Sequence, residues 1–236
     1  MTGSDERPLP VLRAALAVTG AAKRLRPSTA TTVAERRAAG ERSPLSMPNV
    51  TRAGRGPLTV EDHDADGVRL RGYRPGGASG SLPAHVLIHG GAYWAGSVEA
   101  YGPLCAWYAR TVPCHVFSVD YRLAPEHPYP AGVEDCWTAL AWVAEHADEL
   151  GVDPDRLSVG GVSAGAGLAA AVALLDRDRS GPVLRLQLLE IPMLDPAMSQ
   201  PSLGTYGQGF GLTKDDVATG WRHYLPGGAP DAYAGA

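Results

Sequence analysis

The sequence predicts an α/β fold, a mostly parallel sheet flanked by helices, built around one globular core. Short apolar runs that end near glycine alternate with longer helical stretches along most of the chain. The chain has 236 residues, of which 44% are hydrophobic. That length and composition are sufficient for one domain with a sizeable core.

A hairpin and four buried strands are expected. In "PLTVEDHDADGVRLRGYRP", two alternating runs flank Asp66-Gly67, a dipeptide that favours a tight hairpin turn. Four compact apolar runs that follow are typical of parallel strands covered on both faces. These runs are Ala84–Gly90, Cys114–Tyr121, Arg156–Gly161 and Leu184–Leu194.

Helices are expected between these strands and at both ends of the chain. The predicted helices are Pro10–Leu25, Ala30–Gly40, Ser97–Thr111, Val133–Gly151, Ser163–Asp178 and a short one from Lys214. The stretch after Leu194 is predicted as loop, and the last residues, "APDAYAGA", as structureless. The predicted division is an N-terminal helical cap segment over residues 1–50, a core over 51–195 and a second cap segment over 196–236.

Composition excludes several classes of partner. The net charge is −4 with 19% charged residues, so the field is too weak to indicate nucleic acid or a membrane surface. No apolar run approaches the roughly 18–20 residues of a membrane span. The patch Ala14–Ala22 follows mixed charges and makes a poor signal peptide, so a cytoplasmic location is expected.

The cysteines indicate neither a metal site nor a disulfide framework. Cys105, Cys114 and Cys136 are an odd number without Cys-x-x-Cys spacing. They are expected to be ordinary thiols in a reducing compartment. No metal and no organic cofactor are expected.

The first candidate for chemistry is Gly161-Val162-Ser163-Ala164-Gly165, which fits Gly-x-Ser-x-Gly. The pattern follows a predicted strand and opens a predicted helix, the context in which it places a serine nucleophile on a sharp turn. The helix N-terminus contributes positive partial charge near the serine. Ser163 is therefore the candidate nucleophile.

The second candidate is "IHGGAYWAGS", which also follows a predicted strand. A His-Gly-Gly-x loop at that position can direct backbone N–H groups at a developing oxyanion. The candidate oxyanion-hole amides are those of Gly90, Gly91, Ala92 and Ala164. His89 is expected to support the loop and not to act as a base, while Tyr93 and Trp94 are candidates for the substrate pocket or for core packing.

The third motif, "YRLAPEHPYPA" (Tyr121–Ala131), makes the resemblance specific. Together with "HGGAY" and "GVSAGAG" in this order, it resembles the microbial hormone-sensitive-lipase-like esterases, which have the α/β-hydrolase fold and cleave carboxylic esters. The resemblance covers about residues 57–225. Arg122, Glu126 and His127 are expected to be polar struts that fix a loop.

Two departures from this family's usual motifs stand out. The family usually has Gly-Asp-Ser-Ala-Gly-Gly, whereas here Val162 replaces the aspartate and Ala166 the last glycine. The family usually has His-Gly-Gly-Gly, whereas here Ala92 is the third residue after the histidine. Neither departure removes a required group, since backbone amides bind the oxyanion, but both are expected to affect the pocket.

The sequence lacks a matching base. In α/β-hydrolases the order is Ser, then Asp or Glu, then His, and the resemblance places the acid and the histidine after two further strands that this sequence does not contain. His223 and Asp195 are the candidates within the chain, each weak. His85 and His115 lie in strand runs and are expected to be structural.

Without that base the chain is expected to retain only roughly 10³–10⁴-fold catalysis over water, from the oxyanion hole and substrate binding. Three explanations are open: a piece of a longer esterase, an enzyme completed by a separate polypeptide, or a non-catalytic relative that binds small esters or a protein. Leu184–Leu194 is expected to be an unprotected sheet edge, open to strand pairing or homo-oligomer formation. The leading function is serine carboxylesterase activity on a small or short-chain ester.

Overall fold

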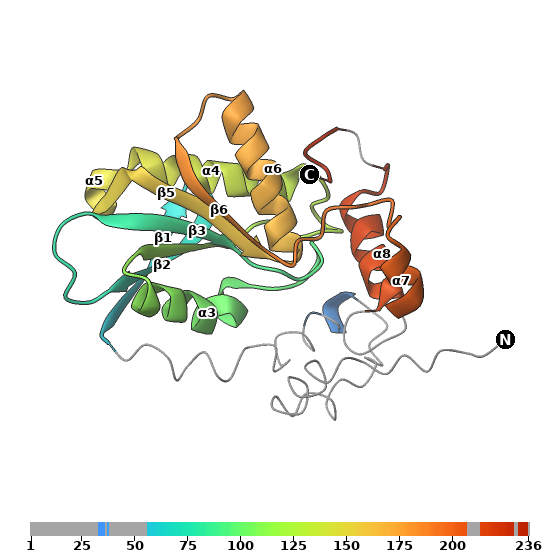
Figure 1. Ribbon diagram of the computed structural model, residues 1–236, viewed down its shortest axis with the longest axis horizontal. Helices are drawn as coiled ribbons and strands as arrows, with labels where there is room; N and C mark the ends of the chain where they lie inside the picture. Colours follow the sequence, from blue (N-terminus) through green and yellow to red (C-terminus); the bar gives the residue numbers. More distant parts are fainter. Residues whose placement is uncertain (1–32, 36, 38–55, 207–212, 229–230, 236) are drawn as a thin grey trace.

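A computed structural model describes residues 33–35, 37, 56–206, 213–228 and 231–235. Its centre is a six-stranded sheet in the order β1-β2-β4-β3-β5-β6 (Figure 1). All six predicted strands are present, with shifted ends. They are β1 (Leu58–Ala65), β2 (Val68–Pro75), β3 (Leu82–Ile88), β4 (His115–Val119), β5 (Val152–Val162) and β6 (Leu184–Glu190).

The sheet is mostly parallel, which confirms the predicted α/β class. β3 pairs in parallel with β4 and β5, and β5 with β6, while the β1–β2 hairpin joins β4 in the antiparallel direction. Val86, Phe117 and Val159 in the central strands are completely buried. Parallel strands require cover on both faces, and their continuous apolar runs supply the contacts.

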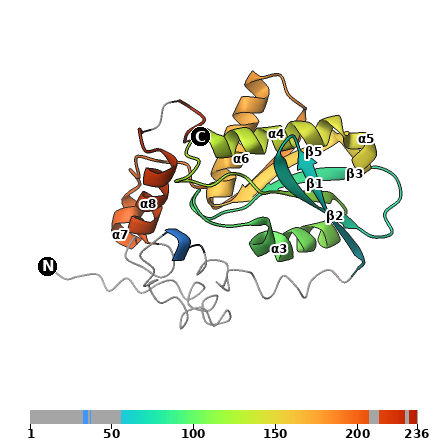
Figure 2. The same ribbon diagram turned by 180° about the vertical axis from the view of Figure 1, so that it is seen from behind.

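Helices provide this cover. α3 (Val98–Thr111) lies on one face, and α4 (Ala131–Glu145) and α6 (Ala164–Asp178) lie on the other (Figures 1 and 2). The predicted single helix Val133–Gly151 is wrong in its second half, because α4 ends at Glu145 and a separate α5 (Ala147–Leu150) follows. The His146 ring bonds to the Trp142 carbonyl at 3.0 Å, the same carbonyl that the helix uses, and the chain turns there.

β6 forms the edge of the described sheet. Among the described strands it pairs only with β5, and Leu186 is 56% exposed. The predicted continuation to Leu194 is wrong, because Ile191 adopts a φ of 45° and ends the strand at Glu190. A β-branched residue in the left-handed region is incompatible with further strand geometry.

Two short helices follow β6 at one end of the sheet. The segment predicted as loop contains α7 (Pro201–Tyr206), and α8 (Lys214–Tyr224) begins with a capping box between Thr213 and Asp216. Figure 1 shows that α7 and α8 lie next to the described helical residues 33–35 and 37, which belong to the predicted helix Ala30–Gly40. The predicted helix Pro10–Leu25 lies outside the described residues.

The C-terminal segment 231–235 is anchored, contrary to the expectation that it is structureless. The Tyr129 hydroxyl donates to Asp231 at 2.7 Å, the Tyr233 hydroxyl donates to Asp178 at 2.7 Å, and Ala234 is buried. Hydrogen bonds to side chains far away in the sequence hold this segment in place. The composition of the segment itself does not reveal these bonds.

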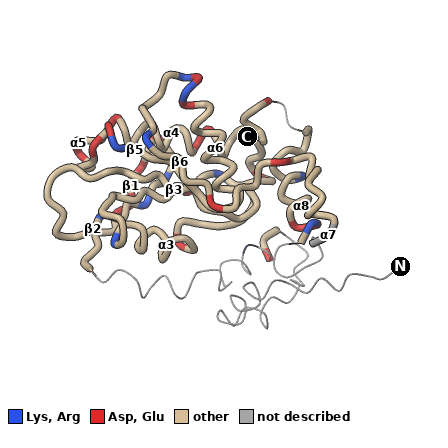
Figure 3. The backbone as a smooth tube through the Cα atoms, in the orientation of Figure 1, with Lys and Arg blue, Asp and Glu red and all other residues tan. Residues whose placement is uncertain are grey.

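Charges of both signs are intermixed over the described elements (Figure 3). The densest network joins the hairpin to α3, where Arg69 contacts Asp62 at 2.9 Å and Glu99 at 3.0 Å. Cys105, Cys114 and Cys136 are buried free thiols, and burial raises the pKa of Cys114 to about 11. No helix in the described ranges is long and apolar enough to cross a membrane.

Candidate active site

Ser163 lies on a sharp turn between β5 and α6. Its backbone adopts φ 57° and ψ −118°, a conformation that is unfavourable for a residue with a side chain. Surrounding bonds hold it: the Ser163 N–H donates to Glu190 O at 2.8 Å, and its carbonyl accepts from the N–H groups of Ala166 and Met193. The turn therefore fixes the serine at the carboxyl end of the parallel strands.

Two glycines make this turn possible. A Cβ at Gly165 would lie 2.1 Å from the Ile88 carbonyl oxygen, and one at Gly161 would lie 2.4 Å from the Gly165 carbonyl carbon. Both neighbours are backbone atoms, which do not rotate away as a side-chain end does. The spacing of Gly-x-Ser-x-Gly thus reflects the contact of β5, α6 and the end of β3 around Ser163.

The loop after β3 lies directly beside the serine. A Cβ built at Gly90 would be 3.3 Å from the Ser163 Cβ. Gly91, Ala92 and Tyr93 have φ values of 137°, 52° and 69°, three consecutive positive values. This conformation brings the N–H groups of Trp94 and Ala95 onto the Gly91 carbonyl, at 3.2 and 2.9 Å. We refer to residues 89–96, which contain three of the four candidate oxyanion-hole amides, as the oxyanion loop.

Three of the four candidate amides are available for a ligand. Among the described residues, the N–H groups of Gly91, Ala92 and Ala164 donate to no protein acceptor. Ala164 is the first residue of α6, where helical geometry leaves amides unsatisfied and the helix dipole favours negative charge.

The fourth candidate, Gly90, lies beside the Tyr101 side chain: a Cβ built at Gly90 would be 2.6 Å from the Tyr101 hydroxyl oxygen. Burial raises the pKa of that phenol. Tyr101 belongs to α3 and stacks at a tilt near His89, with ring centroids 5.8 Å apart. Sequence reasoning did not identify Tyr101, since an aromatic residue on a predicted helix is more often only packing.

His89 is completely buried beneath the oxyanion loop. Its ring bonds to the Gly90 carbonyl at 2.9 Å, so Nδ1 carries the proton, because a carbonyl only accepts. The ring stacks on Tyr121 at 4.3 Å, and the Tyr121 hydroxyl donates to the His89 carbonyl at 3.0 Å. Burial lowers the pKa of His89, so the imidazole is neutral at pH 7.

Tyr93 and Trp94 connect the oxyanion loop to α8. Tyr93 is buried, stacks on Tyr224 at 4.1 Å and donates its hydroxyl to the Met193 carbonyl at 2.7 Å. Trp94 is 9% exposed and meets His223 edge to face at 6.2 Å. Both residues therefore pack the loop against its neighbours in this structure.

α8 also touches the third position of the oxyanion loop. A Cβ at Gly220 would lie 2.7 Å from the Ala92 carbonyl oxygen and 2.9 Å from the Ala92 Cβ. The helix backbone is thus in contact with the residue that replaces the third glycine of the family motif.

The motif "YRLAPEHPYPA" supports the site from outside. Arg122 pairs with Asp135 of α4 at 2.7 Å, and the Arg122 backbone N–H donates to the same carboxylate at 2.8 Å. Glu126 accepts two bonds from Arg37, at 3.0 and 2.6 Å, and that guanidinium lowers the pKa of Glu126. Arg122 and Glu126 are polar struts, as predicted; Arg37 was missed, because no motif marks it.

Neither candidate acid–base residue contacts Ser163. The Asp195 carboxylate accepts the Ser199 hydroxyl and N–H at 2.7 and 2.8 Å, and these bonds lower its pKa. His223 lies against Trp94. The hydrogen bonds that histidine rings make in the described part of the chain go elsewhere: His85 bonds to Ser158, His89 to the Gly90 carbonyl and His146 to the Trp142 carbonyl.

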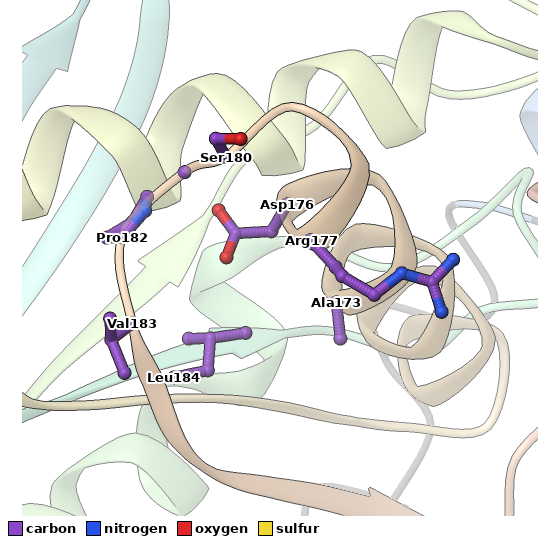
Figure 4. Close-up of a pocket in the computed structure, with 8 residues that line it drawn as sticks. Ala173, Asp176, Arg177, Ser180, Pro182, Val183 and Leu184 are labelled. Carbon is purple, nitrogen blue, oxygen red and sulfur yellow. The ribbon is translucent and has the colours of Figure 1, made fainter.

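A shallow cavity of about 330 Å³ lies at the opposite end of α6, between the end of that helix and the start of β6 (Figure 4). Asp176 lines it together with Arg177, Ser180 and Pro182. Asp176 follows Ser163 by thirteen positions on the helix, about 20 Å along the axis. This cavity is therefore separate from the candidate active site.

Comparison with known proteins gives the chain's relatives. A family described as alpha/beta hydrolase fold matches residues 85–234. The carboxylic ester hydrolase LipN of Mycobacterium tuberculosis is 44% identical over 161 residues, 66% of this chain and 42% of that protein. The carboxylesterase NlhH of the same organism is 42% identical over 160 residues, 68% of this chain and 50% of that protein. The chain spans half or less of the length of these curated relatives.

Solved structures of esterases are also similar to this chain. A hyperthermophilic esterase from Pyrobaculum calidifontis is 35% identical with a TM-score of 0.82, covering 96% of this chain and 74% of that one. An esterase from the bacterial hormone-sensitive lipase family is 29% identical with a TM-score of 0.80, covering 93% of this chain and 71% of that one. The predicted fold class is thus shared with known esterases.

Gly165→Ala should destabilise the protein by about 3 kcal/mol or more, because its Cβ overlaps the Ile88 carbonyl and the backbone has to move. Urea unfolding measures this. Gly227→Ala, where the added Cβ meets nothing within 4 Å, is the control and should change stability little. Equal stability of the two variants would contradict the proposed close contact at the turn.

Gly220→Ala should destabilise the protein although alanine favours helices by about 1 kcal/mol, because its Cβ presses on the Ala92 carbonyl. Gly204→Ala in α7 adds the same methyl into open space and should be neutral or stabilising. Thermal unfolding of both variants measures the effect. A midpoint temperature of Gly220→Ala at or above that of the wild type would contradict the close contact between Gly220 and Ala92.

Proposed function

Because this chain belongs to the α/β-hydrolase family, alongside esterases of the hormone-sensitive-lipase family, we propose that it is a carboxylic ester hydrolase acting through Ser163. One observation carries the proposal. A strained serine at the start of a helix lies beside a loop whose amides are free, with Gly90 next to the Ser163 Cβ. That combination serves acyl transfer.

In the proposed reaction, the Ser163 Oγ attacks the ester carbonyl carbon while a base takes the hydroxyl proton. The N–H groups of Gly91, Ala92 and Ala164 stabilise the negative oxygen of the tetrahedral intermediate. Gly90 is left out because the Tyr101 hydroxyl lies close against its backbone. The alcohol leaves with the proton, and water then releases the carboxylic acid from the acyl-enzyme.

The remaining residues have supporting roles in this proposal. Neutral His89 holds the Gly90 carbonyl and with it the start of the oxyanion loop. Tyr93 and Trp94 line the pocket only with the parts that do not pack on α8. The small residues at the turn and the loop favour a short-chain ester. The proposed division is a core of residues 51–195 with two cap segments, 1–50 and 196–236; of the first segment, only residues 33–35 and 37 lie within the described residues. The proposed location is the cytoplasm.

A second candidate is a non-catalytic relative that binds a small ester or a protein partner. The observation in its favour is that the described histidines contact other groups: His85, His89 and His146 bond to Ser158, Gly90 and Trp142, and His223 lies against Trp94. A serine without a base is a weak nucleophile.

Self-association through the β6 edge is also proposed. Leu186 is exposed along a strand whose outer hydrogen-bonding groups have no partner strand among the described residues. Such an edge pairs readily with another strand.

Imidazole in solution should reveal the nucleophile. With p-nitrophenyl acetate or butyrate, the wild-type chain plus imidazole is expected to react at least about tenfold faster than Ser163→Ala plus imidazole, because a positioned base contributes on the order of 10²–10⁴ and a diffusing one less. A fluorophosphonate should label Ser163 under the same conditions, as peptide mass analysis shows.

Two other results would change the assignment of the base or the proposed function. Ser163-dependent hydrolysis without imidazole that is lost in His223→Ala would assign the base to His223. Equal rates for wild type and Ser163→Ala under both conditions, with no labelling, would reject the esterase proposal and leave the binding one.

Leu186→Lys should reduce self-association, because a charge on an edge strand opposes pairing. Sedimentation velocity across a concentration series measures it. Val60→Lys on β1, at the other edge of the sheet and 49% exposed, is the matched control and should leave self-association unchanged. A wild-type chain that stays monomeric throughout contradicts the edge proposal.

A further inference from the structure

The Arg37 side chain joins two loops that meet at the candidate active site. Its Nε donates to the Trp94 carbonyl at 2.7 Å, and one terminal nitrogen donates to the Ala124 carbonyl at 2.8 Å. The guanidinium also makes two bonds to the Glu126 carboxylate, at 3.0 and 2.6 Å. A planar group with several donors in a fixed arrangement suits such a set of acceptors.

The acceptors belong to the oxyanion loop and to the Tyr121–Ala131 motif that packs beside it. The Trp94 carbonyl lies two residues after Ala92, whose amide is a proposed oxyanion donor. The Ala124 N–H donates to the Tyr93 carbonyl at 3.0 Å. The peptide units around Ala124 therefore hold Tyr93 directly, and Arg37 holds the next carbonyl of the same loop.

The oxyanion loop needs such restraint. Gly91, Ala92 and Tyr93 all have positive φ values, which alanine and tyrosine rarely adopt. Unfavourable backbone persists only where surrounding contacts fix it. α8 supports one side of Ala92 through Gly220, and Arg37 fixes the carbonyl that follows Tyr93.

We propose that Arg37 is a positioning residue for the oxyanion hole: by binding the Trp94 and Ala124 carbonyls together with Glu126, it holds the amides of Gly91 and Ala92 toward Ser163. This assignment rests on the proposed esterase function. Arg37 acts through the loop backbone and does not touch the reacting atoms.

The two kinds of acceptor predict different effects of substitution. The Glu126 side chain is 53% exposed, so its ion pair with Arg37 is screened by solvent and contributes little to folding. The bonds to the two carbonyls determine the position of the loop. Arg37→Ala removes both kinds of bond, whereas Glu126→Gln keeps an acceptor oxygen and leaves the carbonyl bonds in place.

Arg156 provides a matched control. Its Nε bonds to the Asp153 carboxylate at 2.6 Å and its Nη2 to the Ser81 carbonyl at 2.9 Å, so it also joins a carboxylate and a carbonyl. It lies within β5, seven positions before Ser163, which follows the end of that strand. Arg156→Ala removes comparable bonds far from the oxyanion loop.

The first test measures Ser163-dependent hydrolysis of p-nitrophenyl butyrate in the presence of imidazole. Arg37→Ala should lower kcat about tenfold with little change in KM, because loss of one oxyanion donor costs roughly 10²–10³ and a displaced donor costs less. Arg37→Lys should restore part of the rate, Glu126→Gln should lose less than Arg37→Ala, and Arg156→Ala should match wild type.

The second test does not depend on catalysis. Hydrogen exchange at the Trp94 and Ala95 amides, which bond to the Gly91 carbonyl, should accelerate about tenfold in Arg37→Ala and stay unchanged in Arg156→Ala. If the chain shows no Ser163-dependent reaction while this exchange accelerates, the esterase proposal fails and the positioning contact stands. If the exchange rates and the kcat of Arg37→Ala equal those of Arg156→Ala, the inference is overturned. If Arg37→Ala does not fold, Arg37→Lys replaces it in both tests.

Discussion

The candidate site depends on one close contact, that of the Gly165 backbone with the Ile88 carbonyl. A single methyl group at that position would separate the start of α6 from the end of β3. Because the two backbones touch, the turn that carries Ser163 and the loop that begins at His89 lie side by side. The candidate nucleophile and the candidate amide donors therefore come from segments far apart in sequence, and the sheet register brings them together: Ile88 pairs with Gly161.

This contact has an energetic cost at both segments. Ser163 and Ala92 hold positive φ values, each costing on the order of 1–3 kcal/mol in isolation. Hydrogen bonds in the neighbourhood offset that cost: Glu190 and Met193 bond to the Ser163 backbone, and buried His89 bonds to the Gly90 carbonyl. These two strained positions are thus restrained by their neighbours, as expected where amides must be preorganised.

The sequence predicted the parts of the site that are locally encoded. Gly161 and Gly165 stand at fixed distances from Ser163, since the turn itself excludes side chains there, and the strand–helix context of the turn is readable from apolar runs. Arg37 and Tyr101 were not predictable in this way. Arg37 binds carbonyls 57 and 87 residues away, and a backbone carbonyl leaves no mark on residue identity.

The ends of the elements were missed for similar reasons. β6 ends at Glu190 because Ile191 turns to positive φ and Met193 bonds to the Ser163 carbonyl. An apolar run continues past that point, so the pattern alone extends the strand too far. The anchored segment 231–235 depends on Asp178 and Tyr129, which belong to distant parts of the chain.

The replacement of glycine by alanine at position 92 has a physical explanation in α8. The facing position is Gly220, whose Cα side is in contact with Ala92. Space occupied by the alanine methyl is available because the helix has no side chain at that point. Ala92 and Gly220 therefore form one packing unit, which ties α8 and the oxyanion loop to a common position. Arg37 bonds to the Trp94 carbonyl of the same loop. Two residues distant in sequence, Arg37 before β1 and Gly220 after β6, therefore restrain the loop that lies beside Ser163.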